Sequence, residues 1–155
     1  MQRRLFVLAG GTLALPAAFA HHGWSSFDQD RPLYLEGRAA RVSWRNPHVE
    51  LDVEVDPAAK LPPDLRSRAL PAQSATVDGP KLLANAQLPT RRDRVWHVEL
   101  APLTRVQAWQ VVEVKPGDPL ALIGYTFVGE KGDAVLRAEY LFVGGKAYAM
   151  RSSPA

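Results

Sequence analysis

The stretch that most constrains the fold is 49–56, where aliphatic and acidic residues alternate strictly. The odd-numbered positions are aliphatic: Val49, Leu51, Val53 and Val55. The even-numbered positions are acidic: Glu50, Asp52, Glu54 and Asp56. Because successive side chains of a strand point to opposite faces, this pattern predicts a β-strand with one core face and one acidic, exposed face. His48 shares the acidic parity, so we expect its imidazole to open the exposed face beside carboxylates.

The remaining periodicity is also mostly of the β type. We expect strands over 33–44, 95–100, 120–127, 135–143 and 146–150, and a short helix over 102–112. Gly37 within the first strand indicates a bulge or a bend. The order of strands, with one helix between the third and fourth, is that of an all-β, OB-fold-like small barrel. An antiparallel β-sandwich built from the same strands is the competing assignment.

Residues 57–94 interrupt this pattern with a segment rich in Pro, Ala, Arg and Asp. A loop of this length inside a compact domain is uncommon, and it is either functional or poorly ordered. We expect a mobile loop with a helical turn near Lys81–Ala86.

Residues 1–20 have the three parts of an export signal. Arg3 and Arg4 are basic, an apolar run covers 5–15, and Ala18-Phe19-Ala20 is a small-residue cleavage site. The apolar run is shorter than the roughly 20 residues that span a bilayer, so we expect cleavage and a periplasmic protein without a membrane span. The paired arginines also suit the twin-arginine route, and the Sec route stays open. Residues 21–155 then form a single domain.

Composition excludes several kinds of site. The chain has no cysteine, which excludes disulfides, thiolate metal ligands and covalent c-type haem. The net charge of +3 includes Arg3 and Arg4 of the signal, so charge gives no reason to expect nucleic acid as a partner. Gly-x-Ser-x-Gly and phosphate-loop motifs are absent, which disfavours hydrolases and nucleotide binding. Any metal site should therefore use nitrogen and oxygen ligands.

A metal site is predicted at the new amino terminus. A cut after Ala20 would make His21 the first residue, whose α-amine and ring Nδ1 can close on one cation. His22 adds a third nitrogen and His48 a fixed point at the start of a strand. A weaker oxygen ligand, or an acceptor that orients an imidazole, would come from one of two nearby carboxylates: Asp28 or Glu50. This donor set favours Cu(II), with Zn(II) as the second choice.

Several motifs carry a resemblance across nearly the whole chain after the signal. They are His21-His22, Phe27-Asp28, Leu35-Glu36-Gly37, Trp44-Arg45-Asn46-Pro47-His48, Trp96 and Pro116-Gly117-Asp118. Together they resemble an uncharacterised family, a domain of unknown function, of small exported bacterial proteins. Two features depart from the family pattern: the 57–94 loop is longer, and Ala108 stands before Trp109 where a glycine is typical. The resemblance implies no activity.

Three functions remain open on these residues. The first is a periplasmic protein that binds Cu(II) as cargo without catalysis, with the metal ion as its ligand and another periplasmic protein as a candidate partner. The second is a metal-free module that binds a ligand or partner on the barrel face. The third is a copper-dependent redox enzyme, because an amino-terminal His chelate resembles the copper brace of oxidative polysaccharide-cleaving enzymes.

Overall fold

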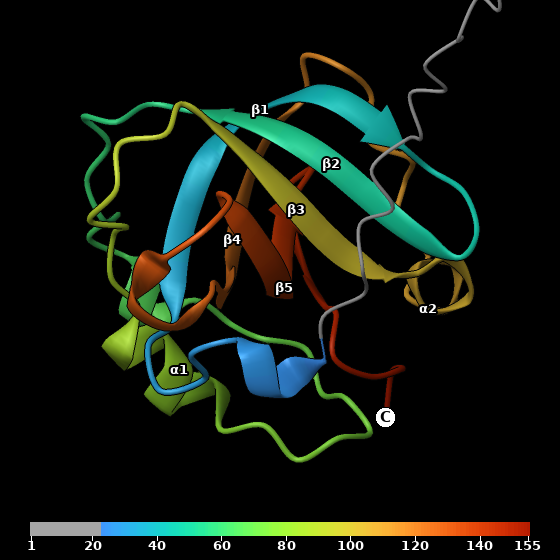
Figure 1. Ribbon diagram of the computed structural model, residues 1–155. Helices are drawn as coiled ribbons and strands as arrows, with labels where there is room; N and C mark the ends of the chain where they lie inside the picture. The colour runs from blue at the N-terminus through green and yellow to red at the C-terminus, as the bar shows by residue number, and fades with distance from the viewer. Residues whose placement is uncertain (1–22) are drawn as a thin grey trace, which may run out of the picture.

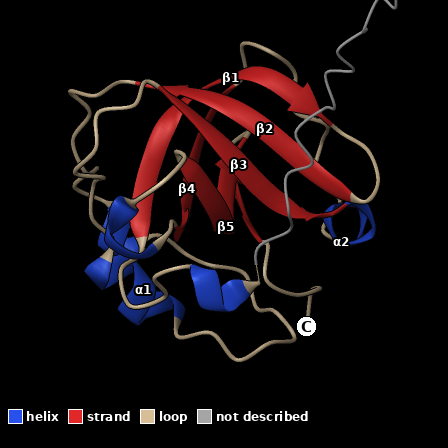
Figure 2. Cartoon of the chain, in the orientation of Figure 1, coloured by secondary structure: helices blue, strands red, loops and turns tan. Residues whose placement is uncertain are grey.

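The computed structural model describes residues 23–155, and its centre is a small β-barrel of the OB type (Figures 1 and 2). The strands are β1 (Leu33–Ser43), β2 (His48–Val55), β3 (Val95–Pro102), β4 (Pro119–Tyr125), β5 (Val135–Val143) and β6 (Lys146–Ala149). They lie in the order β3-β2-β1-β4-β5-β6, and a parallel pairing of β3 with β5 closes the barrel. The predicted OB-like barrel is confirmed, whereas the sandwich alternative fails because the sheet closes on itself.

The helical segments are short. They are η1 (Trp24–Ser26), η2 (Leu65–Ser67), α1 (Gly79–Asn85), α2 (Leu103–Ala108) and η3 (Val128–Glu130). α2 lies between β3 and β4, as predicted, but it ends before Trp109. Gln110 adopts a left-handed φ of 51°, which ends the helix before the β-branched pair Val111-Val112. Within residues 23–155, no helix is long and apolar enough to cross a membrane.

Two apolar layers hold the strands. The first fills the barrel with inward-facing residues, such as Leu51, Val53 and Trp96, each at most 1% exposed. The second covers the outer face of β1, β4 and β5, where Tyr34, Ile123 and Tyr140 point away from the barrel interior and are also buried. The predicted core face of β2 is therefore confirmed. Where β1, β4 and β5 carry the second layer, the sheet is buried on both faces.

Segment 57–94 supplies the cover of that outer face. Leu65 of η2 and Leu83 of α1 are each 2% exposed and pack into the second layer. The helical turn predicted near 81–86 is present as α1, whose amino end is capped by the Asp78 side chain. We expected a mobile loop, but the segment is packed. The apolar residues of this segment show no repeating period in the sequence, because they lie in short, separate turns and each contacts the sheet on its own.

Gly37 lies where the backbones of β1 and β2 come close together. A Cβ atom at this position would stand 1.9 Å from the carbonyl oxygen of Glu54 on the neighbouring strand. The irregularity in the pairing lies just beyond it, between Ala39 and Arg41. The predicted bend therefore begins two residues after Gly37, at Ala39. At position 37 itself a glycine is needed because a side chain would collide with the backbone of β2.

We predict that Gly37→Ala destabilises the fold by about 2 kcal/mol or more, because the backbone must move to admit the methyl group. The check is the urea midpoint of unfolding of each variant. Ala40→Ser, an exposed change in the same strand, is the matched control and should stay within about 0.5 kcal/mol. Equal midpoints for the two variants would contradict the close approach.

Glu130 joins three separate segments. Its buried carboxylate accepts hydrogen bonds from the backbone N–H groups of Thr90 and Arg91 and pairs with the guanidinium group of Arg31. Burial by itself raises the pKa of Glu130, but the backbone hydrogen bonds and Arg31 outweigh it, and the pKa lies below its ordinary value. The ionised carboxylate therefore ties the end of segment 57–94 to the barrel.

We predict that Glu130→Gln costs about 1–3 kcal/mol at pH 7, since an amide replaces an ionised, fully bonded acceptor. The sign follows from the lowered pKa. The stabilisation is fully present above the unfolded pKa of about 4.3 and is lost as pH falls through the folded pKa. Urea unfolding at pH 7 and pH 3 measures it. A gap between wild type and variant that widens in acid would contradict this role.

Candidate functional site

β2 places two of the predicted ligands on one face. His48 and Glu50 open the strand on the outward parity, and both are partly exposed while Val49 between them is fully buried. Opposite them on β3, His48 pairs with Pro102 and Glu50 with Glu99, with an irregularity between the two pairs. The imidazole and the two carboxylates therefore gather where β2 begins and β3 ends.

A pocket of about 380 Å³ lies at this place. Its lining combines the first described residues of the chain with the ends of β2, β3 and β5: Gly23, Trp24, His48, Glu50, Glu99, Leu100, Ala101, Pro102, Arg105, Arg137 and Met150. We call it the amino-terminal pocket. Its size is that of a small-ligand site, and its walls include ionisable groups from three strands.

Trp24 holds the start of the described chain against the barrel. The Cζ atoms of Arg151 and Arg137 lie 4.2 and 5.1 Å from the centre of its ring, and Tyr125 meets the ring edge-on at 6.4 Å. Cation–π contacts of this kind contribute about 0.5–2 kcal/mol each. Figure 1 shows this segment, in blue, packed against the barrel near the carboxyl terminus.

Phe27 fixes the same segment a second time. Its side chain is 3% exposed and stacks on Phe127 with ring centres 4.9 Å apart. The backbone N–H of Asp28 donates to the carbonyl of Thr126, and Phe27 forms a bridge with Phe127. Trp24 and Phe27 therefore both hold this segment on the barrel.

The arginines that flank Trp24 are themselves held by carboxylates. Arg137 Nη2 donates to Glu99 Oε2 at 2.6 Å, and Arg151 Nη2 lies 2.7 Å from Oε2 of Glu139. Glu139 is fully buried, and this burial raises its pKa although Arg151 opposes the shift. Two ion pairs, Arg137–Glu99 and Arg151–Glu139, therefore hold the arginines that contact Trp24, and their carboxylates belong to β3 and β5.

The predicted site residues are distributed unevenly. His48 and Glu50 share the amino-terminal pocket, whereas Asp28 does not line it, and its Oδ1 accepts from the N–H of Asp30. His21 and His22 lie outside the described residues. Gly23, which follows His22 directly, lines the pocket. Within the described part of the chain, no group of three or more His, Asp or Glu side chains is arranged to hold a metal ion.

His97 belongs to a separate cluster. Its Nδ1 lies 3.0 Å from Asp52 Oδ1, while Arg41 donates to the other oxygen of Asp52. Burial raises the pKa of Asp52, but the hydrogen bonds from Arg41 and His97 outweigh it and hold the pKa below its usual value. His97 is a partly buried strand histidine, with its side chain 16% exposed.

Sequence reasoning missed Glu99, Arg137 and Met150 as walls of the pocket. The outward parity of Glu99 and Arg137 in their predicted strands was the available signal. It could not identify them because their proximity arises from the parallel pairing of β3 and β5, which places Glu99 opposite Arg137.

Comparison with known proteins gives one match. Residues 11–61 are similar to a family of unknown function, DUF6152. No curated protein and no solved structure shows significant similarity to the chain. The predicted resemblance to an uncharacterised family is confirmed for this part of the chain, which includes the His-His pair, η1, β1 and the whole of β2. Trp96 and Pro116-Gly117-Asp118 lie beyond the matched residues.

We predict that Trp24→Ala releases the amino-terminal segment without unfolding the barrel, because its contacts are made with side chains on the barrel surface. Hydrogen exchange of the Phe27 and Asp28 amides should accelerate about tenfold or more, the equivalent of losing one or two such contacts. Val112→Ala, at an exposed site, is the control. Unchanged exchange in the Trp24 variant would show that the ring does not hold the segment.

Proposed function

We propose that this chain is an exported periplasmic metal-binding protein whose preferred ion is Cu(II), with Zn(II) as second choice. The site would form after cleavage behind Ala20, from the amine and Nδ1 of His21, the ring of His22 and the ring of His48. One observation carries the proposal: Gly23, the residue next to His22, lines the same pocket as His48 and Glu50.

Chain geometry supports this assignment. Consecutive Cα atoms are about 3.8 Å apart, so the backbone of His22 starts within one residue of the pocket and that of His21 within two. Trp24 and Phe27 already hold the neighbouring segment. The entropic cost of presenting an amino-terminal chelate is therefore smaller than for a free terminus.

The charges of the pocket are compatible with a cation. Arg137 is paired with Glu99, and Arg105 donates to the neutral carbonyl of Met150, so with Glu50 the carboxylates and guanidinium groups of the lining are equal in number. Glu50 is the remaining carboxylate of the lining and becomes the preferred oxygen donor. Asp28 is the less favoured candidate, because it does not line the pocket.

The donor types support Cu(II). An amine and several imidazoles form a nitrogen-rich site, and Cu(II) stands highest in the affinity order of divalent ions for such donors. Met150 also lines the pocket, but its side chain is 1% exposed and belongs to the barrel core. We propose the metal as cargo, with a second periplasmic protein as its donor or acceptor.

We predict that the exported protein binds one Cu(II) and that His48→Ala lowers the affinity about 100-fold, since even a residue that only orients a ligand contributes roughly 10–100-fold. Amine and imidazole nitrogens bind metal only when deprotonated, so the affinity should fall steeply below about pH 6. Competitive titration against a copper chelator between pH 5 and pH 8 measures both effects.

Two controls accompany this titration. Intact mass establishes that the protein begins at His21. His97→Asn changes an imidazole outside the pocket and keeps an amide that can donate to Asp52, so it should leave the affinity within about twofold. The proposal is wrong if His48→Ala and His97→Asn bind copper equally, or if the affinity is flat across the pH range.

A further inference from the structure

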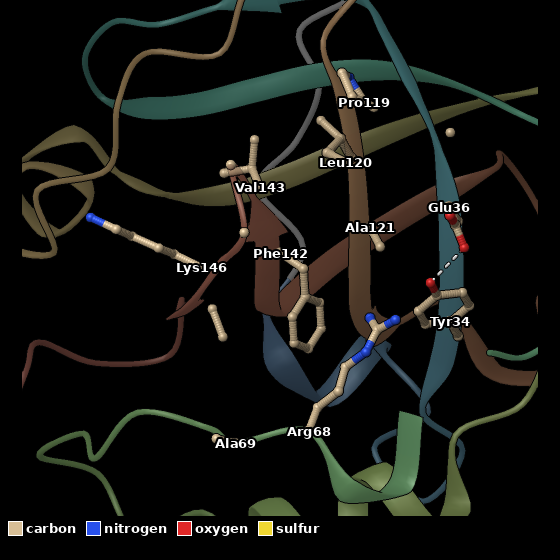
Figure 3. A pocket seen from close by; sticks show the side chains of 14 residues that line it. Tyr34, Glu36, Arg68, Ala69, Pro119, Leu120, Ala121, Phe142, Val143 and Lys146 are labelled. Carbon is tan, nitrogen blue, oxygen red and sulfur yellow. Dashed lines mark hydrogen bonds between the residues drawn. The ribbon is translucent and has the colours of Figure 1, made fainter. Parts of the chain in front are cut away.

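A second concave surface lies on the outer face of β1, β4, β5 and β6, and we call it the outer groove (Figure 3). Its volume is about 680 Å³, within the range of small-molecule sites. None of its lining residues belongs to the amino-terminal pocket: Tyr34, Glu36, Gly37, Arg68, Ala69, Pro119, Leu120, Ala121, Phe142, Val143, Gly144, Gly145, Lys146 and Ala147.

The register of the sheet explains why the surface is hollow here. One row of outward side chains runs across four strands, because Glu36 pairs with Ala121, Ala121 with Phe142, and Phe142 with Ala147. Two small alanines flank one large ring, so the ring has an open space on each side. With strands about 4.8 Å apart, the row is roughly 14 Å long.

The adjacent row of outward side chains contrasts with it. There Ile123, Tyr140 and Ala149 are at most 2% exposed, because segment 57–94 covers them. The cover ends at Arg68 and Ala69, which form one wall of the groove. The groove is therefore the part of the outer face that the second apolar layer leaves open.

Arg68 brings a positive charge onto this apolar floor. Its Cζ lies 5.1 Å from the centre of the Phe142 ring and 5.9 Å from that of Tyr34, and its Nε donates to Asp64 at the rim. In Figure 3 the guanidinium group extends from the loop to a position beside Phe142, pointing toward Ala121. A guanidinium group stacked in this way presents a flat fork of N–H donors suited to a carboxylate.

The other charges give the groove a polarity. Lys146 adds a second cation from the β5–β6 hairpin, and Glu36 stands at the β1 end, where its Oε2 accepts from the Tyr34 hydroxyl at 2.7 Å. Figure 3 shows the Arg68 guanidinium group between Phe142 and Tyr34, whereas Lys146 extends away from them. A ligand with one negative group would place it by Arg68, on the side of the Phe142 ring.

We propose that the outer groove binds a small organic carboxylate with a flat apolar body. The carboxylate pairs with Arg68, and the body lies on Phe142 between Ala121 and Ala147. The apolar floor favours burial of a ring, and the charge-assisted hydrogen bonds with the guanidinium group fix its orientation. This inference is independent of the metal site.

The test uses naphthoate and its neutral isostere naphthamide as probes on the exported protein, with a chelator present to empty any metal site. Isothermal titration should give saturable binding of naphthoate. Arg68→Gln should weaken naphthoate about tenfold and leave naphthamide within about twofold, since only the carboxylate loses charge-assisted hydrogen bonds to the guanidinium group.

Two further variants keep the test decisive. Arg66→Gln removes an exposed arginine of η2, two residues before Arg68 and outside the groove lining, and should leave naphthoate binding unchanged. Ala147→Phe should fill the groove and abolish binding of both probes while the unfolding midpoint is kept. Equal binding of naphthoate and naphthamide, no saturable binding, or self-association through the groove in place of ligand binding would overturn the proposal.

Discussion

The parallel pairing of β3 with β5 is the constraint on which the rest of the structure depends. It closes the barrel and places Glu99 opposite Arg137. The ion pair between them orients the Arg137 guanidinium group, whose Cζ lies 4.4 Å from the ring centre of Phe27 and 5.1 Å from that of Trp24. Barrel closure therefore creates the surface on which the amino-terminal segment docks, and that docking brings Gly23 to the pocket of His48.

The two candidate binding surfaces arise from different physical causes. The amino-terminal pocket forms where strand ends expose ionisable side chains, so its chemistry is that of charged and imidazole groups. The outer groove forms where Ala121 and Ala147 flank Phe142 beyond the edge of the second apolar layer. Its chemistry is that of apolar burial with one stacked guanidinium group. Each surface can be altered without touching a residue of the other.

The alternation of apolar and polar residues was sufficient to predict individual strands and the direction of their side chains. The alternation along 49–56 predicted β2 and the outward direction of His48, and β5 has the predicted bounds, Val135–Val143. Pairing across the barrel could not be predicted, because parity assigns a face to Arg137 but does not identify its neighbours. The cover formed by 57–94 was missed because its leucines are spaced irregularly. Asp28 is close to His22 in sequence, yet of the two predicted oxygen donors only Glu50 lines the pocket.

The most direct test of the proposed metal site is to locate bound Cu(II) on the chain that begins at His21. Cu(II) added below one equivalent broadens the NMR signals of nuclei close to it. Our account predicts that the amide signals of Trp24, Glu50 and Ala101, all in the amino-terminal pocket, are lost first, while those of Ala121 and Phe142 in the outer groove persist. Broadening centred on Asp52 and His97, or spread evenly over the barrel, would contradict it.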